Sequence, residues 1–228
     1  MRALLVLLGC AALAGSPACT ADTSDGAPST DATTEDEELV ASRCESAYGA
    51  KLRAKIAVAR ERLDHLDTPY ARTMREELDA GRVVALPFCK VTKGDFEEFR
   101  KDLDLSAFGS TAEEQWNAIR RGDASGIKSV HTQVYGYAWE NRVYLSTAMS
   151  DSRVLETLAH EVQHVLRKAH LRNFKDQRVT CVEELEAFKA EVLVKKAVIP
   201  DDELAAMHAN LLELYELDHI RAGTCTYR

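Results

Sequence analysis

The chain has 228 residues, of which 46% are hydrophobic and 29% charged, and 29 lysines and arginines against 37 aspartates and glutamates give a formal net charge of -8. A hydrophobic fraction this high can bury a sizeable core, so the composition excludes a wholly disordered protein. The acidic balance argues against a nucleic-acid-binding protein, which needs a basic face for the phosphates, and no apolar run beyond the N-terminus is long enough to span a membrane.

Residues 1–18 have the layout of an export signal. One basic residue, Arg2, precedes an uncharged apolar stretch over residues 3–14, which is followed by small residues. The segment is too short for an ordinary transmembrane helix. Cys19 comes next, and this arrangement resembles a bacterial lipoprotein signal, in which cleavage exposes a cysteine that is then acylated. We expect export and a lipid anchor at Cys19 in the cell envelope; the alternative is simple cleavage and a free secreted or periplasmic protein.

Residues 19–42 are predicted to form a disordered acidic tether. They are rich in Thr, Ser, Asp, Glu and Ala and contain few large apolar residues, so burial cannot offset the entropy of ordering them. Seven acidic residues and the basic Arg2 give the first 42 residues a net charge of -6, which leaves -2 for residues 43–228. The predicted folded domain is therefore nearly neutral.

The hydrophobic pattern of residues 43–228 predicts one domain with more helix than strand. Helical spacing recurs over residues 44–66, 69–80, 95–103, 112–120, 150–170, 182–197 and 201–220. Ser150, Asp151 or Ser152 is expected to cap the fifth of these helices. Strand-like segments are residues 83–88, 130–137 and 142–147, with a hairpin turn expected over residues 139–141. Helices packed on a small sheet make an α+β fold.

Four cysteines fall in this domain: Cys44, Cys89, Cys181 and Cys225. In an oxidising compartment such a set is expected to form two bridges, and three pairings are possible. We favour Cys44 with Cys89 and Cys181 with Cys225, because each pair then closes one half of the domain. No two of these cysteines have the close spacing of a zinc knuckle, which argues against a structural zinc site built from them.

Residues 157–166 read TLAHEVQHVL and contain His160, Glu161 and His164 in the spacing HExxH. On a helix, residues four apart lie one turn above each other, so both imidazoles can reach one ion while Glu161 lies beside it. Zinc accepts two such nitrogens, needs a third protein ligand, and in catalytic sites leaves the fourth position to water. The alternative is a surface helix with two solvated histidines.

The extended motif resembles the signature of the zincin metallopeptidases, with Thr157 three residues before the first histidine and only uncharged residues inside the motif. Glu184 stands twenty residues after His164, and with Ala187 it forms a Glu-x-x-Ala pattern. This spacing and pattern resemble the gluzincins, which include the thermolysin-like enzymes. The resemblance covers residues 150–197. It implies a zincin-like fold with a small antiparallel or mixed sheet beside the metal helix, and Zn²⁺ held by His160, His164 and Glu184.

Three other residues compete for the third ligand position. Glu183 and Glu186 point about 100° and 200° away from Glu184 on a helix, so at most one of the three faces the ion squarely, and we favour Glu184. His170 stands where a metzincin places its third histidine, but those enzymes carry a glycine where this chain has Arg167. We expect Arg167 to continue the helix and so to turn His170 away from the metal face.

The predicted function is zinc-dependent peptide-bond hydrolysis, with Glu161 as general base. Residues 142–147 resemble the zincin edge strand that pairs with an extended substrate, which favours a peptide or protein substrate. Thermolysin-like enzymes support the first histidine with an Asp where this chain has Phe188, so that support must come from elsewhere. The alternative is a catalytically silent, zincin-derived lipoprotein that binds a peptide or protein; the intact Glu161 argues against it. Candidate oxyanion donors are His208, Tyr215, His219, Tyr135, Tyr137 and Tyr144.

Overall fold

The computed structural model describes residues 41–101, 105–121 and 134–228. The predicted export signal, Cys19 and most of the predicted tether lie outside these ranges. Residues 41–43 are already helical, so helix is present two residues before the predicted start of the domain at residue 43. The described residues form a mainly helical fold with one small mixed sheet, which confirms the predicted α+β class.

The sheet has three strands in the order β1–β3–β2. β1 (Val84–Pro87) pairs in parallel with β3 (Arg142–Leu145), and β2 (Gly136–Trp139) pairs with β3 in antiparallel fashion. The predicted hairpin is therefore confirmed, but its bounds differ: β2 runs to Trp139, which was predicted to lie in the turn, and of the predicted strand 130–137 only residues 136 and 137 are strand in the described part of the chain. The expectation that residues 142–147 form an edge strand is wrong, because β1 occupies the other side of β3. Among the described residues, β2 is the outer strand that contacts α6 (Val154–Leu166), the helix that carries the HExxH motif.

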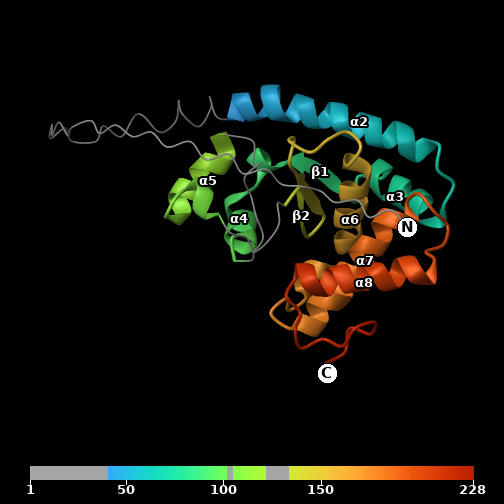
Figure 1. Ribbon diagram of the computed structural model, residues 1–228. Coiled ribbons are helices and arrows are strands. Elements are labelled where there is room, and N and C mark those ends of the chain that lie inside the picture. The colour runs from blue at the N-terminus through green and yellow to red at the C-terminus, as the bar shows by residue number, and fades with distance from the viewer. Residues whose placement is uncertain (1–40, 102–104, 122–133) are drawn as a thin grey trace, which may run out of the picture.

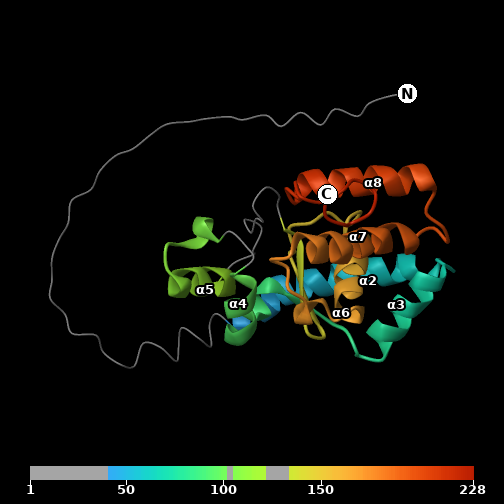
Figure 2. The same cartoon turned by 90° about the horizontal axis from the view of Figure 1, so that it is seen from below.

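Helices surround the sheet in layers (Figures 1 and 2). Figure 1 shows α8, α7, α6 and α2 in succession from the bottom to the top of the molecule, with α3 on the right, and in both views α4 and α5 lie beside the sheet at the left-hand end. The helices and helical turns in chain order are η1 (Cys44–Gly49), α2 (Ala50–Asp64), α3 (Pro69–Asp79), η2 (Phe88–Lys90), α4 (Lys93–Phe99), η3 (Ser106–Phe108), α5 (Ala112–Arg121), α6 (Val154–Leu166), η4 (Ala169–Leu171), α7 (Gln177–Leu193) and α8 (Asp201–Leu214).

Several helix ends are set by local caps. Thr68 accepts a hydrogen bond from the backbone of α3, whose first residue is a proline, and Thr92 caps α4 in the same way. Asp176 accepts from two backbone N–H groups at the start of α7, so this helix begins five residues before the predicted residue 182. α8 ends at Leu214 rather than at residue 220, because the following chain folds back to place Leu217 in the core beside α7.

The motif helix α6 is shorter than predicted at both ends. It begins at Val154, and Arg153 at its N-cap makes no side-chain cap, so the predicted cap from Ser150, Asp151 or Ser152 is wrong. It ends at Leu166 because Lys168 adopts a left-handed conformation with φ of 54°, after which the chain enters η4. The predicted continuation of the helix through Arg167 to His170 is therefore also wrong.

Two disulfides join the chain as predicted, Cys44 to Cys89 and Cys181 to Cys225. The first ties η1 to η2, and the second ties α7 to the C-terminal segment. Such bridges persist in oxidising environments, so they indicate a location outside the cytoplasm. Among the described residues, none of the helices is both long and apolar enough to cross a membrane.

Candidate metal centre

α6 presents one side to the core and another to α7. Leu158, Ala159 and Val162 are fully buried in the cluster that joins α6 to the sheet and to α2. His160 and His164, one turn apart on the other side, have ring centroids 5.0 Å apart. The apolar side of the helix thus fixes the direction in which both imidazoles point.

Glu184 of α7 completes a group of three potential metal ligands. Its carboxylate oxygens lie 3.4 Å from Nε2 of His160 and 3.6 Å from Nε2 of His164. The three ligand atoms lie within 4.8 Å of one another. Donors about 2.1 Å from a common ion at tetrahedral angles lie ~3.4 Å apart, so the separations to Glu184 suit a zinc ion. Ala187, fully buried one turn further along, lets α7 approach α6 closely.

The charges of the group also suit a cation. Burial alone would lower the pKa of His160, but its hydrogen bonds with Glu184 and Glu191 raise it well above its ordinary value. Burial alone would raise the pKa of Glu184, but the neighbouring His164 and His160 hold it well below its usual range. Burial lowers the pKa of His164 to about 4, which leaves a neutral imidazole suited to metal binding. The carboxylates of Glu184 and Glu191 thus favour a positive charge in the site.

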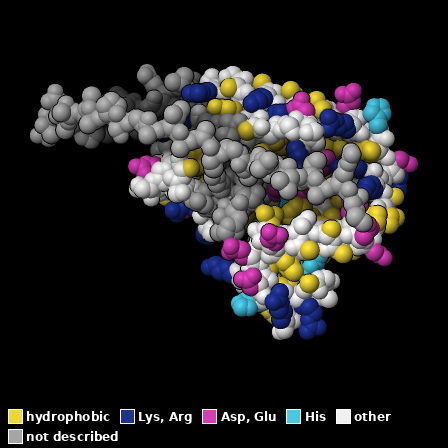
Figure 3. Space-filling model, viewed as in Figure 1, with side chains coloured by type: hydrophobic (Ala, Val, Ile, Leu, Met, Phe, Trp, Pro, Cys, Tyr) yellow, Lys and Arg dark blue, Asp and Glu magenta, His cyan; other side chains and the backbone are white. Residues whose placement is uncertain are grey.

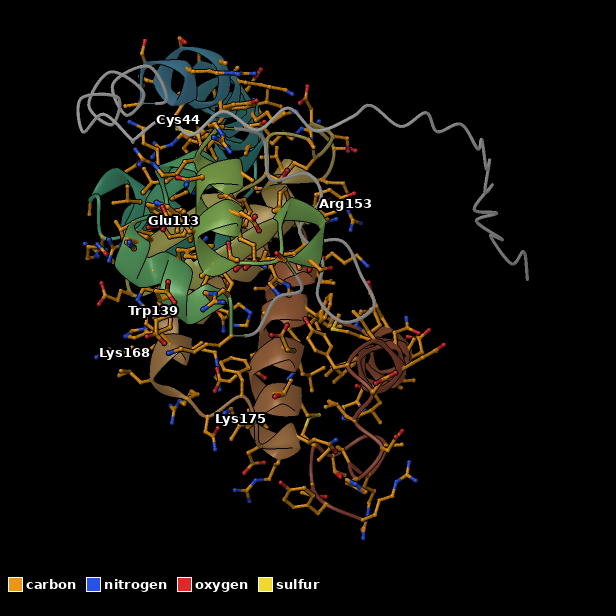
Figure 4. All side chains as sticks on the ribbon, turned by 90° about the vertical axis from the view of Figure 1, so that its left-hand side faces the viewer. Cys44, Glu113, Trp139, Arg153, Lys168 and Lys175 are labelled. Carbon is orange, nitrogen blue, oxygen red and sulfur yellow. A yellow bond between two sulfur atoms is a disulfide. The ribbon has the colours of Figure 1, made fainter. Side chains whose placement is uncertain are left out.

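The other three candidates for the third ligand position make contacts away from His160 and His164. Glu183 forms a two-point ion pair with Arg167, at 2.8 Å to Nε and 3.0 Å to Nη2. Glu186 accepts from Lys189 at 2.7 Å. His170 packs against Trp139, with ring centroids 5.7 Å apart; Figure 4 shows Trp139 near Lys168, at the end of α6. Of the four candidates, Glu184 alone lies with His160 and His164.

Glu191 is a functional candidate that the sequence analysis missed. Its Oε1 lies 2.8 Å from Nδ1 of His160, so the carboxylate holds the proton on Nδ1 and leaves Nε2 free to bind metal. Glu191 follows Glu184 by two helical turns and so lies on the same side of α7. Phe188 lies between them and packs edge-on against the ring of His160, with centroids 4.9 Å apart. Glu191 therefore occupies the supporting place that Phe188 cannot fill.

We expect Glu191→Gln to weaken zinc binding by about 10- to 100-fold, the usual loss when the carboxylate partner of a histidine ligand is removed. The measurement is a competitive zinc titration, with circular dichroism to show that the fold is kept. Glu186→Gln is the matched control on the same helix, and it should bind zinc as the unmodified protein does. Equal affinities for the two variants would show that Glu191 does not orient His160.

Glu161 lies beside the group without joining it. Its side chain is buried, and burial raises its pKa to about 7, with the charges of Glu184 and Glu191 acting in the same direction. Gly136 of β2 leaves the space for it, because a Cβ at this position would lie 2.6 Å from Cγ and Oε1 of Glu161. A glycine at the start of β2 thus lets the strand and a potential general base approach each other closely.

Among the predicted oxyanion donors, Tyr215 reaches the site. Its hydroxyl donates to Oε2 of Glu184 at 2.7 Å, and burial together with the Glu184 charge raises its pKa well above the ordinary value. Tyr144 instead donates to Asp95 in the core, and His219 is exposed. Tyr135 and Tyr137 pack against the two core clusters on either side of the sheet.

His208, the remaining candidate, belongs to a second group of potential metal ligands with Cys181 and Cys225. Its Nε2 lies 3.6 Å and 3.5 Å from the two sulfur atoms. The sulfurs are joined in a disulfide, so no thiolate is available to bind a metal there. Nδ1 accepts from the backbone N–H of Gly223 at 3.0 Å, which gives His208 a structural role in the C-terminal segment.

Comparisons of the chain with protein-family models, with curated proteins and with solved structures found no match.

Proposed function

We propose that this protein is an exported zinc-dependent peptidase of the gluzincin type, with its metal held by His160, His164 and Glu184. The observation that supports this most strongly is the set of separations, 3.4 Å and 3.6 Å, between the carboxylate of Glu184 and the two Nε2 atoms. The two disulfides agree with export. We further propose that residues 1–18 direct the export and that Cys19 carries a lipid anchor.

Bound zinc supplies a Lewis acid that polarises a carbonyl oxygen and lowers the pKa of water. Glu161, buried beside the ligands, accepts the proton of the attacking water and later gives it to the leaving amine. Tyr215 keeps its proton because of its raised pKa, and its hydroxyl donates that proton to Oε2 of Glu184 and so holds the carboxylate in place. Glu191 keeps His160 in the orientation that directs Nε2 to the metal.

The substrate is a peptide in an extended conformation. β2 is the outer strand next to α6 in the described sheet, and its first residue, Gly136, lies against Glu161. A peptide that added to this strand would pass the general base, and backbone hydrogen bonds would hold it without regard to its sequence. β2, and not residues 142–147 as predicted from the sequence, is therefore the strand that would pair with an extended substrate.

Removal of the metal tests the proposal. The purified protein should bind one zinc ion and cleave an unstructured protein such as reduced casein, and a chelator should abolish the cleavage because the ligands alone cannot activate water at neutral pH. Adding back one equivalent of zinc should restore it. Cleavage that continues at full rate in the metal-stripped protein would refute the proposed function.

A further inference from the structure

A groove of about 310 Å³ lies between α7 and α8. Its volume is at the lower end of the range for small-molecule pockets, and suits one or two side chains. In Figure 3, apolar side chains gather where these two helices meet, and Figure 4 views α8 nearly end-on while α7 is seen along its length, so the helices cross. The groove is lined by Phe188 of α7 and by Glu203, Ala206, Met207, Asn210 and Leu214 of α8.

The apolar residues of this groove are not explained by the packing of α8. His208 and Leu211 are the buried residues of α8, and Leu211 belongs to the core cluster around the second disulfide. Met207 and Leu214 lie two turns apart on a neighbouring side of the helix, outside that cluster, and are only half-buried. They form an apolar stripe that faces the groove.

One residue of the groove contacts a candidate ligand, and another precedes a residue that does. Phe188 borders the groove and also packs edge-on against the ring of His160 at 4.9 Å. On the other wall, Leu214 directly precedes Tyr215, whose hydroxyl donates to Glu184 at 2.7 Å. A peptide held at the metal centre would therefore have this groove within reach of its nearest side chains.

We propose that the groove receives an apolar side chain, such as that of Leu, Met or Phe, from the peptide bound at the metal centre. This inference rests on the proposed function and adds a preference for the substrate. Among the six lining residues Glu203 alone is charged, and it is paired with Lys196 at 2.7 Å. The groove thus offers apolar surface, whose burial stabilises an apolar side chain, and no unpaired carboxylate for a basic one.

The test is a binding measurement with the zinc-loaded Glu161→Gln protein, which should hold a peptide without cleaving it. Fluorescent peptides of Gly and Ala are compared, with Ala, Leu, Phe or Asp at one central position. We expect the Leu and Phe peptides to bind about 10-fold more tightly than the Ala peptide, the lower end of the discrimination that an apolar pocket gives, and the Asp peptide to bind most weakly. Equal binding of the Leu and Ala peptides, or no binding of any of them, would overturn the inference.

Variants of the groove give the matched comparison. Met207→Ser and Leu214→Ser, made in the Glu161→Gln protein, should bring the ratio of the Leu and Ala affinities close to one, with zinc content and circular dichroism unchanged. Ala205→Ser, at an exposed position on the opposite side of α8, should leave the ratio as it was. A ratio that survives both groove variants would show that the side chain binds elsewhere.

Turnover by the zinc-loaded protein with Glu161 intact separates this inference from the proposed function. If the Leu peptide binds through the groove but no peptide is cleaved, the proposed hydrolysis is wrong and the groove assignment holds. If all the peptides are cleaved with the same kcat/KM, the proposed function holds and the groove assignment is wrong.

Discussion

Glu161→Gln is expected to lower kcat for peptide hydrolysis by about 10²- to 10⁴-fold, the range that general acid–base catalysis contributes. Glutamine has nearly the same shape as glutamate and fits the space left by Gly136, but its amide cannot accept the proton of the attacking water. Glu161 lies outside the group formed by His160, His164 and Glu184, so the variant should keep its zinc. The measurement pairs steady-state kinetics with metal analysis of the same sample.

Glu156→Gln is the matched control for this prediction. Glu156 lies on the same helix and pairs with Lys195 at 2.9 Å, away from the candidate ligands, so its replacement should leave kcat unchanged. If Glu161→Gln cleaves peptides as fast as the unmodified protein, Glu161 is not the general base. If it instead loses its zinc, Glu161 acts as a ligand rather than as a base.

His164→Ala is expected to weaken zinc binding by more than about 100-fold and to abolish hydrolysis. Loss of a residue that only orients a metal ligand weakens metal binding by about 10- to 100-fold, and loss of the ligand itself should weaken it more. His164 is buried, with Nε2 3.6 Å from Glu184, and alanine removes one of the three candidate ligands. The affinity is measured by competitive zinc titration, and circular dichroism monitors the fold.

His170→Ala serves as the control, because His170 packs against Trp139 and lies outside the group of ligands. This variant should bind zinc as tightly as the unmodified protein. Loss of zinc on replacing His170 as well as on replacing His164 would favour a third ligand of the metzincin type and would contradict the assignment of Glu184.

Residues close together on one helix were the easiest to predict. The spacing of His160, Glu161 and His164 places them by helix geometry alone, and the structure sets them side by side as expected. Glu184 was favoured through a family pattern, and α7 brings it to the two histidines. The three strands were also foreseen, because alternating apolar residues and a polar turn are local signals.

Features that depend on the crossing of distant elements were not predictable. That Glu191 supports His160 follows from how α7 crosses α6, which no local pattern specifies. The strand order depends on β1 pairing with β3 across more than fifty residues. α6 ends early where Arg167 is drawn to Glu183 and Lys168 takes a left-handed conformation; a glycine there would have signalled the end, but a lysine does not.

Anomalous diffraction at the zinc edge, from crystals of the zinc-loaded protein, locates the metal and its ligands. We expect one strong peak, from a zinc ion bonded to Nε2 of His160, to Nε2 of His164 and to the carboxylate of Glu184, with Glu191 still at Nδ1 of His160. Zinc bonded to Glu183, Glu186 or His170 in place of Glu184, or no peak between α6 and α7, would contradict this assignment.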